Sequence, residues 1–222
     1  MKKVFVIAAA ISLLAAPAMA TIVGTKHDLS STNTTVWGAG GGSDTDQVCV
    51  FCHTPHGGAS ASSAPLWNRT TVNATAVYGD PVGTMDATPT LNAVNASDAI
   101  LCLSCHDGAS LTANLTNPPN SLGGAQPTVT ATLGAAAQLG TDLSNDHPVG
   151  FSYATATTTD TELVASPAGV TFYPTDTNGD GIADFNDGMW CSSCHDVHDN
   201  TNAPFLVKSN AASALCTTCH IK

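Results

Sequence analysis

The pattern Cys-x-x-Cys-His occurs four times and uses all eight cysteines of the chain. The copies are Cys49-Val-Phe-Cys52-His53, Cys102-Leu-Ser-Cys105-His106, Cys191-Ser-Ser-Cys194-His195 and Cys216-Thr-Thr-Cys219-His220. This pattern is typical of covalent c-type haem attachment. The two thiols add across the two vinyl groups of one porphyrin, and the histidine that follows lies under the iron as its proximal ligand. The sequence therefore predicts four covalently bound c-type haems.

Other uses of paired cysteines explain the pattern less well. A disulfide framework does not require a histidine after every second cysteine. A zinc site built from two Cys-x-x-Cys knuckles does not need the four histidines. A thioredoxin-like redox pair needs one Cys-x-x-Cys on a βαβ unit, and no such unit is visible in the sequence.

Four histidines remain outside the motifs, which is one for each predicted haem. They are His27, His56, His147 and His198. Methionine is the usual rival as a distal ligand, but only Met85 and Met189 follow the first twenty residues, and Met189 lies too close to Cys191 to reach round its own haem. We therefore expect these four histidines to be the distal iron ligands. Two imidazoles on each iron favour low potentials and leave no open face for catalysis.

The chain divides into two similarly built halves, about 21–125 and 126–222, each with a histidine, a Cys-x-x-Cys-His-x-x-His motif and a Cys-x-x-Cys-His motif. His56 and His198 follow a proximal histidine too closely to reach the opposite face of the same haem. Chain order suggests that His198 ligates the second haem, and that His27 and His147 ligate the first and third. His56 then ligates the fourth haem, either of another subunit or of its own chain.

A separate group of oxygen ligands precedes the third motif. The segment from Asp176 to Asp187 fits the calcium loop D-x-[DN]-x-[DN]-G, with an aspartate where EF-hands carry glutamate at the last position. The predicted Ca²⁺ ligands are Asp176, Asn178, Asp180, the carbonyl of Ile182, Asp184 and Asp187. The alternative is a solvated turn rich in aspartate, asparagine and glycine.

The elements that must position these residues are predicted to be short. Thr, Ala, Ser, Asn and Gly dominate, and the stretches Leu111–Asn145 and Ala154–Ala168 are nearly charge-free and rich in turn residues. We expect these stretches to form loops and short strands. The predicted fold is a loop-rich multihaem cytochrome c fold, with short helices at the haem motifs, a few short strands and a core organised by haem. Ser97 or Asp98 is expected to cap the helix that leads to Cys102, and Ser209 the one that leads to Cys216.

The first residues predict export. Lys2 and Lys3, the apolar run 4–16 and Ala18-Met19-Ala20 form a signal peptide over residues 1–20, so residues 21–222 form a single mature domain. Removal of the two lysines takes the formal charge from −11 to −13. Such a surface repels nucleic acid and anionic membrane. No later segment is long and apolar enough to span a bilayer.

Several segments resemble the extracellular tetrahaem c-type cytochromes of metal-reducing bacteria that polymerise into nanowire filaments. They are Cys49-Val-Phe-Cys-His-Thr-Pro-His56, Pro65-Leu-Trp-Asn-Arg69, Asp146-His-Pro-Val-Gly-Phe151, Cys191-Ser-Ser-Cys-His-Asp-Val-His198 and Ala214-Leu-Cys-Thr-Thr-Cys-His220. The resemblance implies an extracellular or cell-surface location and a head-to-tail homopolymer. It also implies upstream outer-membrane or periplasmic cytochromes as donors and extracellular electron acceptors.

The main alternative is a discrete periplasmic tetrahaem shuttle. Shuttles of that kind resemble shorter chains with lysine around the haem edges, whereas only Lys26, Arg69, Lys208 and Lys222 follow the predicted cleavage point. An enzyme is a more distant alternative, because it needs one iron with an open or weakly held position.

Overall fold

The computed structural model of the protein describes residues 22–61, 64–79, 89–109, 111–176, 178, 180 and 182–221. The predicted signal peptide and Met85 lie outside these residues.

Short helices and strands alternate with long loops, as the composition predicts. The α-helices are α2 (Thr34–Trp37), α3 (Leu91–Asn95), α4 (Ala99–His106), α5 (Tyr153–Thr159), α6 (Cys191–Cys194) and α7 (Cys216–Cys219), and the 3-10 turns are η1 (Cys49–Phe51), η2 (Asn120–Leu122), η3 (Ala135–Ala137) and η4 (Ala211–Ser213). The strands are β1 (Ala59–Ala61), β2 (Ala64–Trp67), β3 (Phe151–Ser152), β4 (Tyr173–Thr175) and β5 (Phe185–Met189). The expectation of a loop-rich fold with short helices at the haem motifs is confirmed.

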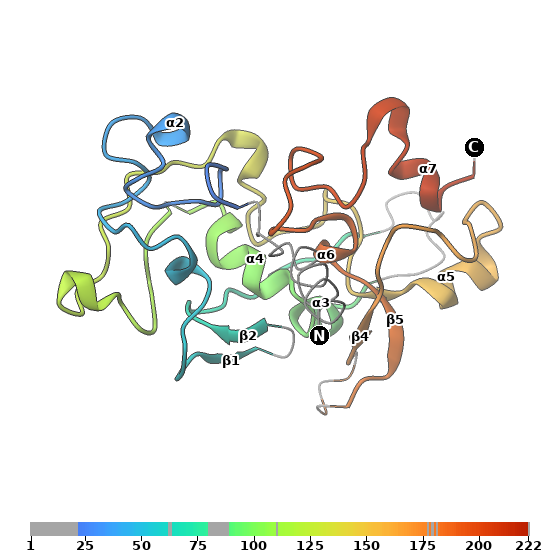
Figure 1. Ribbon diagram of the computed structural model, residues 1–222. Helices are drawn as coiled ribbons and strands as arrows, with labels where there is room; N and C mark the ends of the chain where they lie inside the picture. The colour runs from blue at the N-terminus through green and yellow to red at the C-terminus, as the bar shows by residue number, and fades with distance from the viewer. Residues whose placement is uncertain are drawn as a thin grey trace, which may run out of the picture.

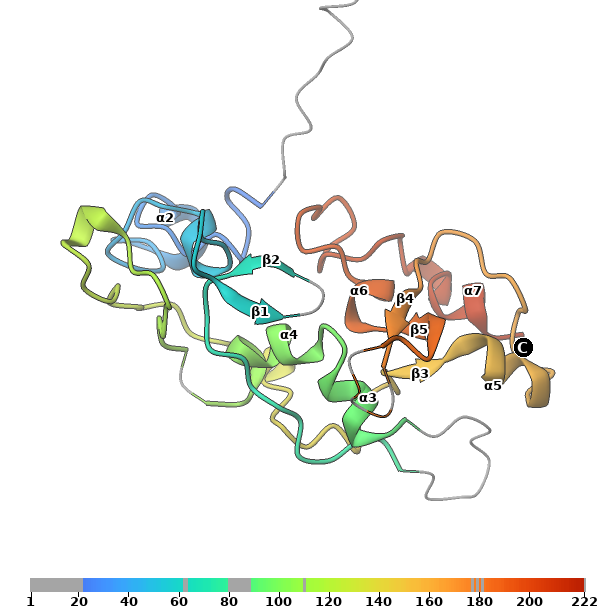
Figure 2. The same cartoon turned by 90° about the horizontal axis from the view of Figure 1, so that it is seen from below.

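The two halves of the chain lie side by side. In both views α2, β1 and β2 occupy one side, and α5, α7 and the β4–β5 hairpin occupy the other (Figures 1 and 2). Helices α4 and α6, which carry the second and third motifs, meet between them. The centre of the molecule is therefore the place where the two halves bring their haem motifs together.

A three-stranded antiparallel sheet of order β3-β5-β4 positions the third motif. Strand β5 leads through Trp190 directly into α6, and the Trp190 indole donates to Thr175 Oγ1 over 2.6 Å and stacks on Tyr173 with centroids 4.9 Å apart. Only glycine fits at position 188, because a Cβ there would collide with Thr175 Oγ1. The sheet thus fixes where Cys191 begins.

Two small apolar clusters support the first three motifs. The first packs against the first motif and contains Leu29, Val50, Phe51, Ala113, Leu115 and Ala131. The second packs against Cys191 and contains Ala74, Val94, Ala99, Leu103 and Leu143. The two clusters contain only six and five buried residues, so bound porphyrins would supply much of the remaining hydrophobic stabilisation.

Helix α5 differs from the expectation of loops and strands over residues 154–168. The Ser152 side chain accepts the Thr155 N–H at 3.0 Å, and the Asp187 carboxylate of β5 accepts the Ala154 N–H at 2.6 Å. These two caps satisfy N–H groups that are otherwise unpaired in the first turn. One of them comes from 33 residues away, which explains why local composition does not reveal the helix.

Within the residues described, no helix is long and apolar enough to cross a membrane.

Candidate haem sites

Each haem motif begins on a turn of helix. The first motif starts on η1, the second lies at the end of α4, and the third and fourth occupy α6 and α7. In the first, third and fourth motifs the histidine N–H donates to the carbonyl of the first cysteine, over 2.8, 3.1 and 3.0 Å. Residues three apart share one face of a helical turn. The local fold therefore presents both thiols of a motif on one side, with the histidine directly after them.

All eight cysteines are free thiols. Burial raises the pKa of Cys52 to about 12, the neighbouring Cys105 adds to this effect, and the Arg69 charge opposes it. In each pair of consecutive motifs, a thiol of one motif raises the pKa of a thiol of the other. The pairs are Cys52 with Cys105, Cys102 with Cys191, and Cys194 with Cys219. Cys49 and Cys216, at the two ends of this series, are exposed.

Six of the eight histidines face one another in three pairs. His27 and His106 have ring centroids 6.1 Å apart, His53 and His198 6.0 Å, and His147 and His220 6.4 Å. Each pair joins one motif histidine to one histidine outside the motifs. Chance contacts between aromatic rings would not pair each motif histidine with a histidine outside the motifs.

The spacing of these rings suits an iron between them. An imidazole nitrogen sits about 2 Å from a bound metal and about 1 Å from its own ring centre, so two rings on opposite sides of one iron have centres roughly 6 Å apart. All three pairs have this separation. The residues of the first, second and fourth motifs therefore fit a haem with two axial histidines.

Backbone carbonyls select the tautomer of three histidines. The Nδ1 atoms of His106, His147 and His195 lie 2.7, 2.9 and 3.2 Å from the carbonyl oxygens of Ala137, Pro148 and Pro204. Because a carbonyl can only accept, Nδ1 carries the proton and Nε2 keeps its lone pair. Such outer contacts orient histidines that bind metals.

His27 is held as a neutral ring. Its imidazole stacks on Phe205, with centroids 4.4 Å apart and planes 15° apart. Burial and, to a smaller extent, the neighbouring charges of His106, His195 and His198 together lower the pKa of His27 to about 4. The neutral form is the one that ligates iron.

The observed ring pairs differ from the ligand assignment expected from chain order. His27 faces His106 of the second motif instead of the first, and His147 faces His220 of the fourth instead of the third. His198 faces His53 of the first motif instead of the second. The N-terminal segment crosses to Phe205, which is far away in sequence, so nearness along the chain does not predict nearness in space.

His56 and His195 are not among the paired rings of the described chain. Both are exposed. The His56 carbonyl accepts from Thr54 Oγ1 at 3.0 Å and from Asn117 Nδ2 at 3.1 Å, which anchors the backbone that presents its ring. Among the described residues, His56, which lies outside the motifs, and His195, which belongs to the third motif, are thus the two histidines whose rings are not paired.

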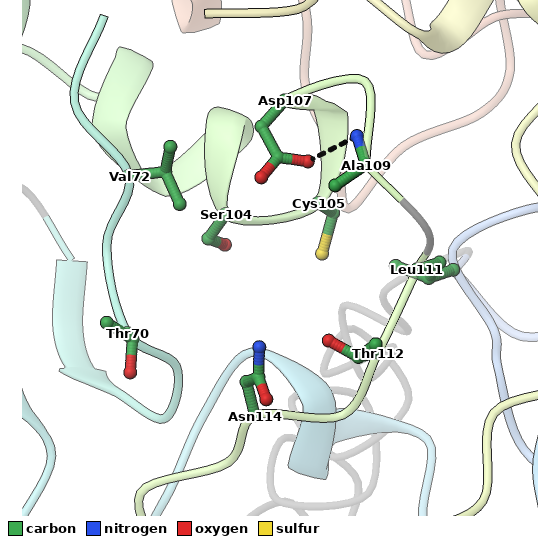
Figure 3. Close-up of a pocket in the computed structure, with 9 residues that line it drawn as sticks. All are labelled: Thr70, Val72, Ser104, Cys105, Asp107, Ala109, Leu111, Thr112 and Asn114. Carbon is green, nitrogen blue, oxygen red and sulfur yellow. Dashed lines mark hydrogen bonds between the residues drawn. The ribbon is translucent and has the colours of Figure 1, made fainter.

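A pocket of 370 Å³ opens beside the second motif. Figure 3 shows the Cys105 sulfur directed into it, above Asn114 and Thr112. Its other lining residues are Thr70, Val72, Ser104, Asp107, Ala109 and Leu111. This mixed polar and apolar space at a motif thiol belongs to the haem region, where an attached porphyrin edge would lie.

Asp98 links two motifs in a way that the sequence did not indicate. It was expected, with Ser97, to cap α4, but its carboxylate accepts the N–H groups of Cys191 and Ser192 at 3.1 and 2.8 Å. Ser97 Oγ accepts the Ala99 N–H at 3.2 Å at the start of α4. Asp98 is 8% exposed, and burial raises its pKa. It therefore ties the start of α4 to the start of α6.

The predicted calcium loop connects β4 to β5. Its oxygens accept the loop's own N–H groups, with Asp176, Asn178 and Asp180 bonded to residues 178, 180 and 182. Asp184 Oδ1 accepts from Asn178 Nδ2 at 3.2 Å. Asp187, the last expected ligand, instead bonds Ser152 and Ala154 beside α5. The described residues contain no group of three or more His, Cys, Asp or Glu side chains arranged to hold a metal ion. Calcium binding stays a prediction.

Comparison with known proteins supports the haem chemistry. The doubled CXXCH motif family matches residues 183–222, which contain the third and fourth motifs. No curated protein matches the chain. The doubled motif and the facing histidines together support covalent binding of haem c and a role in electron transfer.

Proposed function

We propose that the chain carries four bis-histidine c-type haems and that its copies join head to tail into an extracellular filament that conducts electrons. The observation that carries this proposal is the pair of exposed histidines that remains after the other six have paired. His56 is a distal ligand without a ring partner among the described residues, and His195 is a proximal ligand in the same situation.

The internal repeat explains why these two belong together. His27 and His147 are the first histidines of the two halves, and each faces the last motif of its own half at the same interplanar angle of 72°. His198, three residues after the third motif, faces the first motif of the other half. By the same relation His56, three residues after the first motif, serves the third motif. This partner replaces the fourth motif, which chain order suggested.

The positions of the thiols support a contact between the fourth motif of one subunit and the first motif of the next. Inside the subunit, Cys102 lies against Cys191 where the two halves meet, and the pKa of Cys191 rises through this contact. In the internal repeat, Cys216 corresponds to Cys102, and Cys49 corresponds to Cys191. Cys216 and Cys49 are both exposed. A second subunit placed by the same relation brings Cys49 to Cys216 and His56 to His195. A heterologous contact that does not close into a ring continues as a filament.

Coordination of the third haem by His56 of another subunit would hold the subunits together strongly. It would also place the haems of successive subunits in one continuous series. Electrons would cross the junction as they cross between the halves. Two imidazoles on every iron leave no coordination position for a substrate, so electron transfer is the proposed activity, and no enzymatic reaction is proposed. Donors would be upstream outer-membrane or periplasmic cytochromes, and acceptors would lie outside the cell.

The substitution His56→Ala tests the filament. All eight cysteines remain, so four haems should stay attached. The third haem should lose its distal ligand, show a high-spin ferric signal and bind CO rapidly after reduction, and electron microscopy should show no filaments.

The matched control is His198→Ala, which removes the equivalent histidine inside the subunit and should open the iron of the first motif. If His56→Ala protein forms normal filaments with four low-spin haems, His56 does not join subunits. If the wild-type protein is monodisperse under all conditions, the periplasmic shuttle is the better interpretation.

A further inference from the structure

Basic residues are scarce, and two of them occupy equivalent places. Only Lys26, Arg69, Lys208 and Lys222 follow the predicted cleavage point. Arg69 ends the segment Ala64-Pro-Leu-Trp-Asn-Arg69, and Lys208 ends Ala203-Pro-Phe-Leu-Val-Lys208. The shared Ala-Pro start and basic end suggest that the two segments are copies of one unit.

Backbone geometry supports this equivalence. The residue before each cation donates to the second cysteine carbonyl of its half, Asn68 to Cys52 over 2.9 Å and Val207 to Cys194 over 3.0 Å. Bridges also join each segment to a proximal histidine, His53 with Trp67 and His195 with Leu206. Leu66 and Phe205 share positive φ angles of 56° and 59°. The two segments therefore pack against the first motif of each half in the same way.

Arg69 is buried among backbone carbonyls. It is 2% exposed and donates to the carbonyls of Ser104 at 2.9 Å, Thr112 at 2.8 Å and Ala113. The salt bridge identified in the described part of the chain joins His198 and Asp196 and does not involve Arg69. Burial raises the pKa of the Cys52 and Cys105 thiols, and the nearby Arg69 charge opposes this rise at both. This cation therefore lies beside the first and second motifs.

Lys208 repeats the arrangement in the second half. Its Nζ donates to Thr218 Oγ1 over 2.7 Å. Burial raises the pKa of the Cys219 thiol, and the nearby Lys208 charge opposes this rise. Thr218 and Ser104 each stand directly before the second cysteine of the last motif in their half. Each half thus places one cation beside the second cysteine of its last haem motif.

We propose that Arg69 and Lys208 set the reduction potentials of the haems beside them, Arg69 at the first and second motifs and Lys208 at the fourth. When a neighbouring ferrous haem gives up one electron and becomes ferric, the receiving haem gains one negative charge. A nearby cation stabilises that charge, most strongly where water is excluded. The cations therefore make these haems easier to reduce, against a chain of strongly negative net charge.

Spectropotentiometric titration of the holoprotein tests the effect of charge. Arg69→Gln should lower the reduction equilibrium constant of the first or second haem roughly tenfold, which is about 59 mV for one electron. Lys208→Gln should lower that of one haem by a smaller factor. That shift should shrink in high salt, because a half-buried charge is screened more than a buried one.

The charge-retaining variants Arg69→Lys and Lys208→Arg are the controls and should keep wild-type potentials. The proposal is overturned if Lys208→Gln and Arg69→Gln proteins with all haems low-spin titrate like the wild type, or if the charge-retaining variants shift as far as the neutral ones. Should Arg69→Gln fail to fold, the Lys208 pair alone decides. The inference rests on haem binding and not on polymerisation, and a haem count and electron micrographs of the wild type test the proposed function separately.

Discussion

At the scale of single residues, contacts within the protein already orient the histidines that are expected to bind iron. Three histidine Nδ1 atoms face carbonyls, and three pairs of rings stand 6.0 to 6.4 Å apart. Orientation by the backbone reduces the rotamer entropy that a ligand loses when it coordinates. The fold thus places imidazoles where they can bind with little rearrangement.

The pairing of His27 with His106 leads to a sharp test. His27→Ala should open the iron of the second motif and produce one high-spin haem. In a three-haem background that carries Cys102→Ala and Cys105→Ala, the same substitution should create no additional high-spin iron, because its haem is already absent. Magnetic circular dichroism counts the high-spin irons. An additional high-spin haem in that background would favour the first-motif assignment suggested by chain order.

At the scale of elements, Asp98 joins α4 to α6 across 93 and 94 residues of sequence. Asp98→Ala should lower the free energy of unfolding by about 1–3 kcal/mol, because two buried N–H groups at the third motif lose their acceptor. Guanidinium denaturation of the holoprotein measures the change. The control is Asp107→Ala, which removes one bond to Ala109 in an exposed turn and should change stability by less than about 0.5 kcal/mol. Equal losses in the two variants would contradict the assigned role of Asp98.

The β4–β5 loop carries the calcium prediction. Calcium added to chelator-treated protein should raise the thermal midpoint, since a ligand that binds only the folded state stabilises by about 2.7 kcal/mol at a hundred times its dissociation constant. Asp180→Ala should abolish the response. Asp142→Ala, which affects a different exposed turn, should retain it. A thermal midpoint independent of calcium in the wild type would mean that the segment is only a turn.

At the scale of the whole molecule, two small apolar clusters support the haem motifs. Cys102 lies against Cys191 where the two halves meet, and Cys49 and Cys216 are exposed. With Arg69 buried and Lys208 half-buried, a chain of formal charge −11 presents few basic groups at its surface. Docking to acidic partners through basic patches is therefore disfavoured.

The sequence by itself determined the covalent chemistry. Haem attachment requires two thiols and a histidine within five consecutive residues, and a helical turn is enough to bring them together, so spacing alone identifies Cys49 to His53 and its three counterparts. The loop-rich character followed from composition in the same direct way, because few strong helix formers are present. Both properties depend on residues that are close along the chain.

Only the tertiary structure decided which distant groups meet. His27 reaches His106, Asp98 reaches Cys191, Asp187 caps α5, and Arg69 reaches Ser104. Each contact spans tens of residues, and long loops give chain order little control over what becomes adjacent. The internal repeat relates the two halves, but the ring contacts had to be known before it could suggest the third motif as the partner proposed for His56.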